Sequence, residues 1–92
     1  MKNNIYTIIA EMEGGVLTGQ VNDSSPSEAI LSWINDLAAD IILAFGLKID
    51  ELIDLLNNNK AEIDKQGSNF WVHTVTLQSN EIYMFYVVNT VE

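Results

Sequence analysis

The sequence predicts a small α+β domain in which two helices cover one face of a four-stranded, mainly antiparallel sheet. Hydrophobic residues make up 48% of the 92-residue chain, which is enough for a folded core. Segments rich in β-branched and aromatic residues stand at both ends, and two segments with helical periodicity lie between them. The order ββααββ, without a repeat or a linker, indicates one two-layer domain over residues 1–92.

The first predicted hairpin joins two strands, Ile5–Met12 and Val16–Val21, which are rich in strand-forming residues. Their connection is Glu13-Gly14-Gly15, and glycine supplies the positive φ that tight hairpin turns require. A phosphate-binding loop would need more glycines and would open into a helix, whereas another strand follows here. We therefore interpret the glycine pair as a turn. Gly19, inside the second strand, indicates a bulge or a close approach to the backbone.

A helix start follows this hairpin. Ser25 fits the N-cap, Pro26 the first helical position and Glu28 the third, which together form a capping box. Apolar residues then recur with helical spacing as far as Phe45, and Gly46 is a residue that ends helices. These signals predict one continuous helix from Pro26 to about Phe45.

The second predicted helix is Ile49–Asn58, with acidic residues in its first turns, where they complement the helix dipole. The polar segment 57–68 is expected to be a loop, with room for an extra helical turn at 60–66. A second hairpin follows, with strands Phe70–Leu77 and Glu81–Val91 around a turn at 78–80. Hairpin partners are antiparallel, but the order of the two hairpins across the sheet stays open.

The predicted strands carry apolar residues on both faces, although two helices can cover only one. On the last strand, one face would carry Ile82, Met84, Tyr86 and Val88, and the other Tyr83, Phe85, Val87 and Val91. Either the sheet curls and the long loop covers the second face, or that face binds a second copy or another protein. Aromatic residues are enriched at binding hot spots, so we expect Trp71, Tyr83 and Phe85 to contact a partner.

The charge balance is strongly acidic. Thirteen acidic residues face four lysines and no arginine, which gives a formal charge of −9. This balance argues against a nucleic-acid-binding surface, which needs basic residues, and suits solubility or a basic protein partner. From Glu28 to Asp54 there are six acids and one lysine. The expected contacts with a basic partner are Asp36, Asp40, Asp50, Glu51 and Asp54.

Signals for catalysis or for a cofactor are weak. The chain has no cysteine and one histidine, His73, which excludes thiolate sites and zinc sites with several histidines. His73 shares its strand face with Trp71, Val75 and Leu77, so we expect a structural core or rim residue. An enzyme would need His73 in a pocket with a carboxylate. We therefore predict a protein without enzymatic activity, metal or cofactor.

The sequence also favours the cytoplasm. Its longest apolar runs are far shorter than the roughly 20 residues of a membrane-spanning helix. The first residues lack the apolar core and small-residue cleavage site of a signal peptide. The absence of cysteine agrees with an intracellular protein. We therefore expect no membrane association.

The segment 6–34, YTIIAEMEGGVLTGQVNDSSPSEAILSWI, resembles two groups of small bacterial proteins. HicB-type antitoxins have a β-rich segment and then a helix opening with a Ser-x-x-Glu-Ala cap, matched here by Ser25 to Ala29. The HicB pattern has a third strand before that helix. Small acidic immunity-type proteins share the Gly-Gly hairpin, the Ser24 to Trp33 helix start and a C-terminal hairpin containing tryptophan, here from Trp71. The resemblance implies a binding protein that neutralises a basic toxin, such as a nuclease; the alternative is a homodimeric assembly module.

Overall fold

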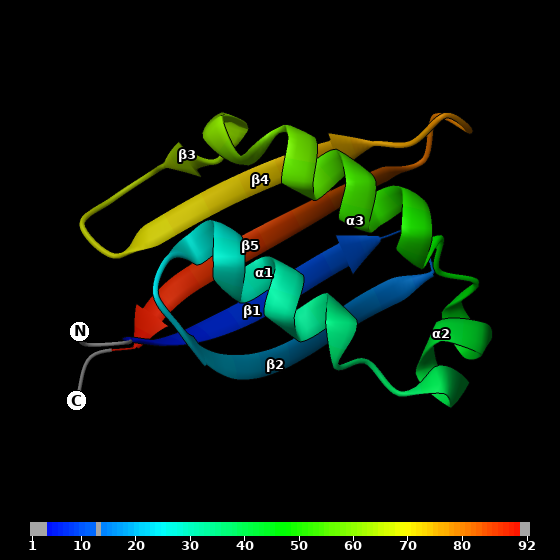
Figure 1. The fold of residues 1–92 in the computed structure, drawn as a ribbon, viewed down its shortest axis with the longest axis horizontal. Coiled ribbons are helices and arrows are strands. Elements are labelled where there is room, and N and C mark those ends of the chain that lie inside the picture. Colours follow the sequence, from blue (N-terminus) through cyan, green and yellow to red (C-terminus); the bar gives the residue numbers. More distant parts are fainter. Residues whose placement is uncertain (1–3, 13, 91–92) are drawn as a thin grey trace.

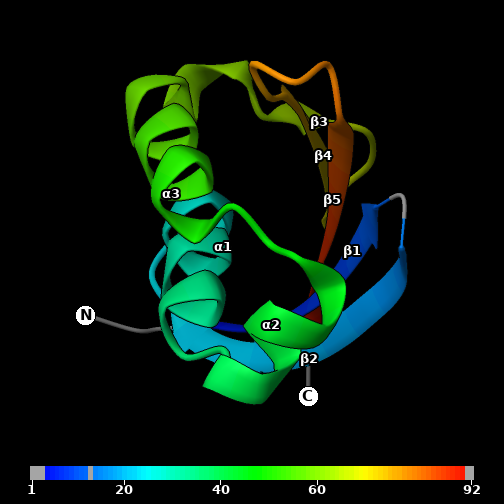
Figure 2. The same cartoon turned by 90° about the vertical axis from the view of Figure 1, so that its right-hand side faces the viewer.

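The chain forms a sheet and a layer of helices packed on one of its faces (Figures 1 and 2). The computed structural model describes residues 4–12 and 14–90, apart from the side chain of Ala61. The α+β class predicted from the sequence is confirmed. In chain order, the elements are β1 Asn4–Met12, β2 Gly15–Asp23, α1 Pro26–Asn35, α2 Ala39–Phe45, α3 Ile49–Asn58, the 3-10 helix η1 Lys60–Glu62, β3 Asp64–Lys65, β4 Phe70–Thr76 and β5 Ile82–Thr90.

The two hairpins join through β1 and β5, which lie side by side in the middle of the sheet (Figure 1). The strand order is β2-β1-β5-β4-β3, and every pairing is antiparallel. This order, which the sequence left open, makes β2 one edge of the sheet. At the other edge β3 pairs only with Trp71 and Val72, so the rest of β4 has no strand on the side away from β5 in the described chain.

The predicted number of strands was wrong because β3 was missed. Its two residues, Asp64 and Lys65, are polar and exposed, and so short a pair has no readable alternation. Its pairing with β4 depends on where the loop lies in the fold. The extra turn expected at 60–66 is present as η1. Glu13 of the predicted hairpin turn and Val91 of the predicted last strand lie outside the described residues.

The predicted start of α1 is confirmed. Ser25 has extended backbone angles, and its hydroxyl accepts a hydrogen bond from the Glu28 amide at 3.3 Å. Pro26 is the first helical residue. The carboxylate of Glu28 pairs with Lys60 at 2.6 Å, which connects α1 to η1. This helix start therefore fixes where α1 begins, and it connects α1 to η1.

Asp23, the last residue of β2, connects the sheet to α1. Its carboxylate accepts hydrogen bonds from the Ser32 hydroxyl and from the Ser24 amide and hydroxyl. These bonds, with that from Ser32 the strongest, hold the pKa of Asp23 below its ordinary value. The ionised carboxylate thus binds the middle of α1 to the end of the edge strand.

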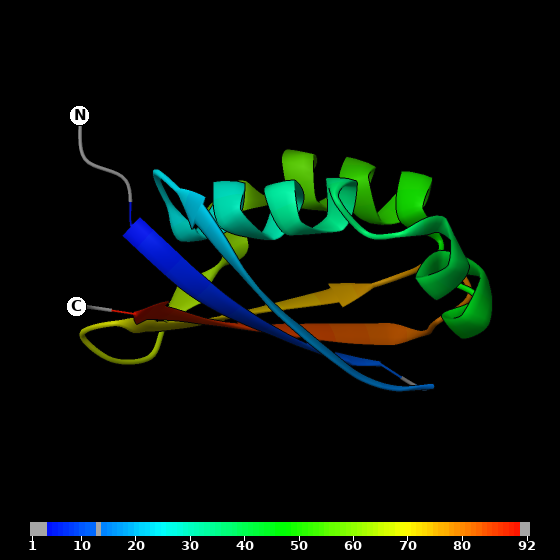
Figure 3. The same cartoon turned by 90° about the horizontal axis from the view of Figure 1, so that it is seen from below.

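The single helix predicted from Pro26 to Phe45 was wrong, because the structure has two helices there. Asp36 ends α1, and Ala38 has the extended angles φ −68° and ψ 147°. The bend turns α2 toward the plane of the sheet (Figure 3). There the Phe45 ring lies 3.4 and 3.3 Å from where a Cβ on Gly14 or Gly15 would stand. A straight helix would keep Phe45 in the helix layer, so burial of this ring against the hairpin favours the break.

The ends of α2 and the bounds of α3 agree with the sequence. Gly46 ends α2 in the left-handed region, at φ 61°, and its N–H donates to the carbonyls of Ile42 and Leu43. The predicted helix Ile49–Asn58 is confirmed as α3. It lies beside α1 over the sheet (Figures 1 and 2) and buries Leu52 and Leu56.

The core lies between the helices and one face of the sheet. Each central strand contributes alternate residues, such as Ile8 on β1 and Phe85 on β5. Gly19 of β2 confirms the close approach predicted there, since a Cβ at this position would lie 2.4 Å from Nε1 of Trp33. A residue without a side chain therefore lets the indole ring of α1 lie directly against the edge strand.

Candidate protein-binding surfaces

The five predicted acidic contact residues lie where the helices begin and end. Asp36 caps α1, Asp40 is in the first turn of α2, Asp50 and Glu51 are in the first turn of α3, and Asp54 follows one turn later. The end of α1, the whole of α2 and the start of α3 lie at the same end of the molecule (Figure 1). We call these five residues the acidic end. The fold therefore brings together acidic residues from three successive helices.

Little positive charge balances the acidic end. All of its residues are exposed except Glu51, which is half-buried and accepts a hydrogen bond from the Gln78 amide at 2.7 Å. Lys48 is the one lysine between Glu28 and Asp54. In the described part of the chain the one ion pair is Lys60–Glu28, outside the acidic end. The four aspartates are therefore available to cations from outside.

The face of the sheet opposite the helices is the second candidate surface, and no described element covers it (Figure 3). Of the two alternatives left open by the sequence, cover by the long loop is not seen in the described residues, since β3 instead extends the edge of the sheet. We call it the open face. The register gives its members as Val16, Thr18, Gln20 and Asn22 on β2, Ile5, Thr7, Ile9 and Glu11 on β1, Ile82, Met84, Tyr86, Val88 and Thr90 on β5, Phe70, Val72, Thr74 and Thr76 on β4, and Asp64 on β3.

The open face has an apolar centre and polar edges. Ile5, Ile9, Met84, Val72 and Val88 are half-buried along the three middle strands. Threonine, glutamine and asparagine occupy the same face of β2 at one edge, and two threonines end β4 at the other. An apolar centre within a polar rim is the usual arrangement of a protein–protein interface.

Side-chain contacts order the middle of the open face. The rings of Phe70 and Tyr86 stack across β4 and β5 with centroids 6.3 Å apart. The Tyr86 hydroxyl donates to the Glu11 carboxylate at 3.2 Å. Desolvation, together with this hydrogen bond, raises the pKa of Tyr86 above its ordinary value. The hydroxyls of Thr7 and Thr90 are 2.9 Å apart, so the face is preorganised from strand to strand.

The three aromatic residues predicted to contact a partner lie on the other face. Tyr83 and Phe85 are 3% and 1% exposed and belong to the core. Trp71 is half-buried and packs edge-to-face on Tyr6, with ring centroids 6.1 Å apart. The prediction separated each strand into two sets of alternating residues. It then placed on the open face the set that the helices in fact cover. The aromatic residues available on the open face are Phe70 and Tyr86 instead.

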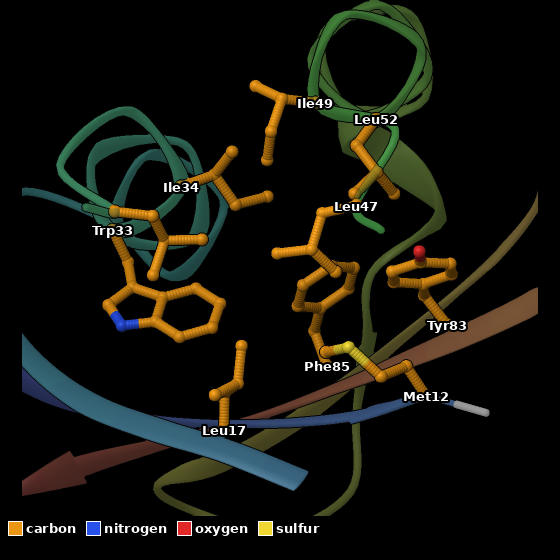
Figure 4. A pocket seen from close by; sticks show the side chains of 10 residues that line it. Met12, Leu17, Trp33, Ile34, Leu47, Ile49, Leu52, Tyr83 and Phe85 are labelled. Carbon is orange, nitrogen blue, oxygen red and sulfur yellow. The ribbon is translucent and has the colours of Figure 1, made fainter. Parts of the chain in front are cut away.

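One apolar space in the core is a packing defect rather than a ligand site. It lies between the helices and the sheet, where Trp33 and Ile34 of α1 face Tyr83 and Phe85 of β5 (Figure 4). Its volume is about 10 Å³. A single water molecule needs roughly that much space, and also polar partners. A substrate or cofactor does not fit.

A larger, polar groove lies between the helix layer and β4. Leu55 and Asn59 of α3, Glu62 of η1 and the segment His73–Thr76 of β4 line it, and its volume is about 230 Å³. His73 is 2% exposed, as its predicted core position requires, and its Nδ1 has no hydrogen-bond partner in the described chain. Burial lowers the pKa of His73, while Glu62 and Asp64 act in the opposite direction. The imidazole is therefore neutral near pH 7.

Sequence reasoning missed this groove because its polar wall comes from the loop after α3. Glu62 and Asp64 stand in a segment with no periodic pattern. His73 and Glu62 line the same space, but no hydrogen bond joins their side chains. A general base needs such an orienting partner.

Neither a metal site nor a membrane-spanning helix is found among the described residues. They contain no group of three or more histidine, cysteine or acidic side chains placed to hold a metal ion. None of their helices has the length and apolar character needed to cross a membrane. Comparison of the chain with protein-family models, with curated proteins and with solved structures gave no match.

Proposed function

We propose that this protein acts by binding another protein, without catalytic activity of its own, and that the open face is the contact surface. The observation that carries the proposal is the uncovered apolar centre of the sheet. Isolated domains rarely leave a contiguous apolar patch of this kind in water, and such patches mark interaction sites. The ordered Phe70–Tyr86 pair gives this surface a rigid aromatic centre.

The partner we propose is a basic protein, and the role is that of an immunity-type or antitoxin-type inhibitor of a basic toxin, such as a nuclease. The formal charge of −9 and the unpaired aspartates of the acidic end support this choice. Charge attraction acts over about 10 Å at ordinary ionic strength, so the acidic end speeds encounter even where it is not itself buried. The open face then supplies the contact area.

A second candidate, a homodimer formed through the open face, is favoured by a specific observation. Among the described residues, only Glu11 and Asp64 bring negative charge to this face. The acidic end lies in the helix layer instead (Figure 1). Two copies would therefore bury their sheets against each other without bringing most of their carboxylates together.

Binding measurements with matched variants separate these proposals. The protein is co-expressed with the products of the reading frames adjacent to its gene, and any complex is measured for affinity and association rate. Met84→Lys places a cation in the open face, whereas Leu43→Lys makes the same kind of change on α2, where Leu43 is 82% exposed. We expect Met84→Lys to weaken binding at least about tenfold and Leu43→Lys to leave it unchanged.

The remaining outcomes decide between partners. Combined substitution of Asp36, Asp40, Asp50 and Asp54 by asparagine is expected to slow association at least about tenfold at low salt, with little effect at high salt. A partner that binds Met84→Lys normally would contradict the proposed surface. A concentration-dependent dimer in sedimentation, abolished by Met84→Lys and without a basic partner, would establish the second candidate.

A further inference from the structure

The groove beside β4 contains an unusual combination of unpaired groups, which the proposed function does not use. His73 is buried almost completely, and its Nδ1 has no hydrogen-bond partner in the described residues. His73 is also one of the residues that line the groove. Buried polar atoms are nearly always hydrogen-bonded, so an exception inside a groove indicates a missing ligand or water. The volume of about 230 Å³ accommodates more than one water molecule.

The same groove runs along a free strand edge. Beyond Val72, β4 has no strand beside it on the side away from β5 in the described chain. The Gln66 amide donates to Phe70 and the Leu77 amide donates to Glu81, so even-numbered residues of β4 direct their backbone groups outward and odd-numbered ones toward β5. Thr74 and Thr76 therefore present N–H and C=O groups to the groove side of the sheet.

The charge around the groove is negative. Glu62 lines it, and Asp64 is close enough to influence the protonation of His73. The two nearby lysines are engaged elsewhere, because Lys60 pairs with Glu28 at 2.6 Å and Lys65 lies over the Trp71 ring at 5.7 Å. A cationic side chain entering the groove would thus find the Glu62 carboxylate, which has no ion-pair partner among the described residues.

We propose that this groove binds an extended basic peptide, which adds to the free edge of β4 as a further strand and places a lysine or arginine beside His73 and Glu62. Backbone hydrogen bonds to Thr74 and Thr76 hold the peptide, as in other cases of strand addition. The cationic side chain donates to His73 Nδ1 and pairs with Glu62. The neutral state of the imidazole, which its lowered pKa ensures near pH 7, leaves Nδ1 able to accept that bond.

The other free edge of the sheet provides an internal comparison. β2 also lacks a neighbour on one side, but the groove lined by His73 and Glu62 borders β4, near the opposite edge of the sheet. Backbone pairing alone would make both edges equally good sites. Preference for β4 would therefore depend on the groove and its charges.

The test uses the full chain, labelled with ¹⁵N, and a capped synthetic peptide of sequence Thr-Val-Lys-Val-Thr, followed by NMR. We expect the largest shifts at the amides of Thr74 and Thr76 and at the imidazole nitrogens of His73, with little change along β2. A peptide with norleucine in place of lysine should bind about tenfold more weakly or worse. The same loss is expected for Glu62→Gln with the lysine peptide, whereas Glu81→Gln, which changes an acid beside the β4–β5 turn that does not line the groove, should have no effect.

Each alternative occupant has its own signature. Binding that maps to β2, or that is equal for the lysine and norleucine peptides, would overturn the proposal, as would no binding up to the solubility of the peptide. Shifts that depend on protein concentration without peptide would assign the edge to a second copy of the chain. If the peptide bound without changing the His73 signals, the groove would hold water rather than the peptide, and the proposal would be overturned. Cleavage of the peptide would identify the groove as an enzyme site, and this too would overturn the proposal.

Discussion

The two faces of the sheet are built from the same strands but have different roles. Ile8 and Ile9 are neighbours on β1, yet Ile8 is fully buried beneath the helices and Ile9 is half-buried on the open face. On β5, Phe85 is in the core, whereas Tyr86 stacks on Phe70 and bonds to Glu11 across the open face. The residue types are alike, so the position of the helices, rather than local composition, decides which face is core and which is available to a partner.

The faces also differ in how closely their side chains fit. On the covered face, Gly19 and Trp33 approach so closely that even a methyl group would overlap the ring. On the open face, the side chains of Thr7, Gln20 and Thr90 instead form hydrogen bonds with one another at the surface. We expect substitutions on the covered face to affect stability and those on the open face to affect binding.

The largest expected effect comes from a matched pair of isoleucines. Ile8→Ala should lower the free energy of unfolding by about 2–5 kcal/mol, because it leaves a cavity in the core. Ile9→Ala should lower it by only about 1 kcal/mol, mainly through reduced strand propensity. Urea denaturation of both variants measures the difference. Equal losses would mean that the open face is as well buried as the core.

A smaller effect is expected at the contact between β2 and α1. Gly19→Ala should cost about 1–3 kcal/mol, because the Cβ would overlap Trp33 and force the indole ring to move. Gly67→Ala is the control, since nothing lies within 4 Å of a Cβ at that position. In the Gly19→Ala background, Trp33→Phe should cost less than in the wild-type protein. Additive losses in thermal or urea unfolding would contradict the proposed contact.

Removal of the α1 cap should have a still smaller effect. Ser25→Ala removes the acceptor for the Glu28 amide and should lower the free energy of unfolding by about 1 kcal/mol. Ser68→Ala, at an exposed position between β3 and β4, should change it little. Similar values for the two variants in urea denaturation would show that the cap does not hold the helix layer on the sheet.

The smallest expected effect is a dependence of the unfolding free energy on pH, which comes from protonation of His73. Burial lowers its pKa below 6.5 in the folded protein, so the unfolded chain binds the proton more readily. Stability is therefore complete above about pH 6.5 and decreases as the pH falls toward the folded-state pKa. His73→Gln should flatten the profile of unfolding free energy below about pH 6.5. An unchanged profile would show that His73 does not contribute.

Local patterns determined much of the fold. Strand alternation divided β1, β4 and β5 into their two faces, the Ser25-Pro26-Glu28 start located α1, and the apolar spacing of Ile49–Asn58 gave the bounds of α3. These features depend on residues a few positions apart, whose periods of 2 and 3.6 are visible in the sequence. The sequence also showed the excess acidic residues, which the fold gathers at the acidic end.

Only the tertiary structure decided which alternating set was covered, and this is why Tyr83 and Phe85 were expected on the open face but belong to the core. Alternation separates two faces but is symmetric between them until helices pack on one. The break before α2, the pairing of β3 and the groove around His73 likewise depend on contacts between distant segments, such as Phe45 against the Gly14-Gly15 hairpin. Burial across the fold outweighs local helical periodicity at residues 36–38, because the helix propensity of a few residues is small beside the apolar surface that the bend removes from water.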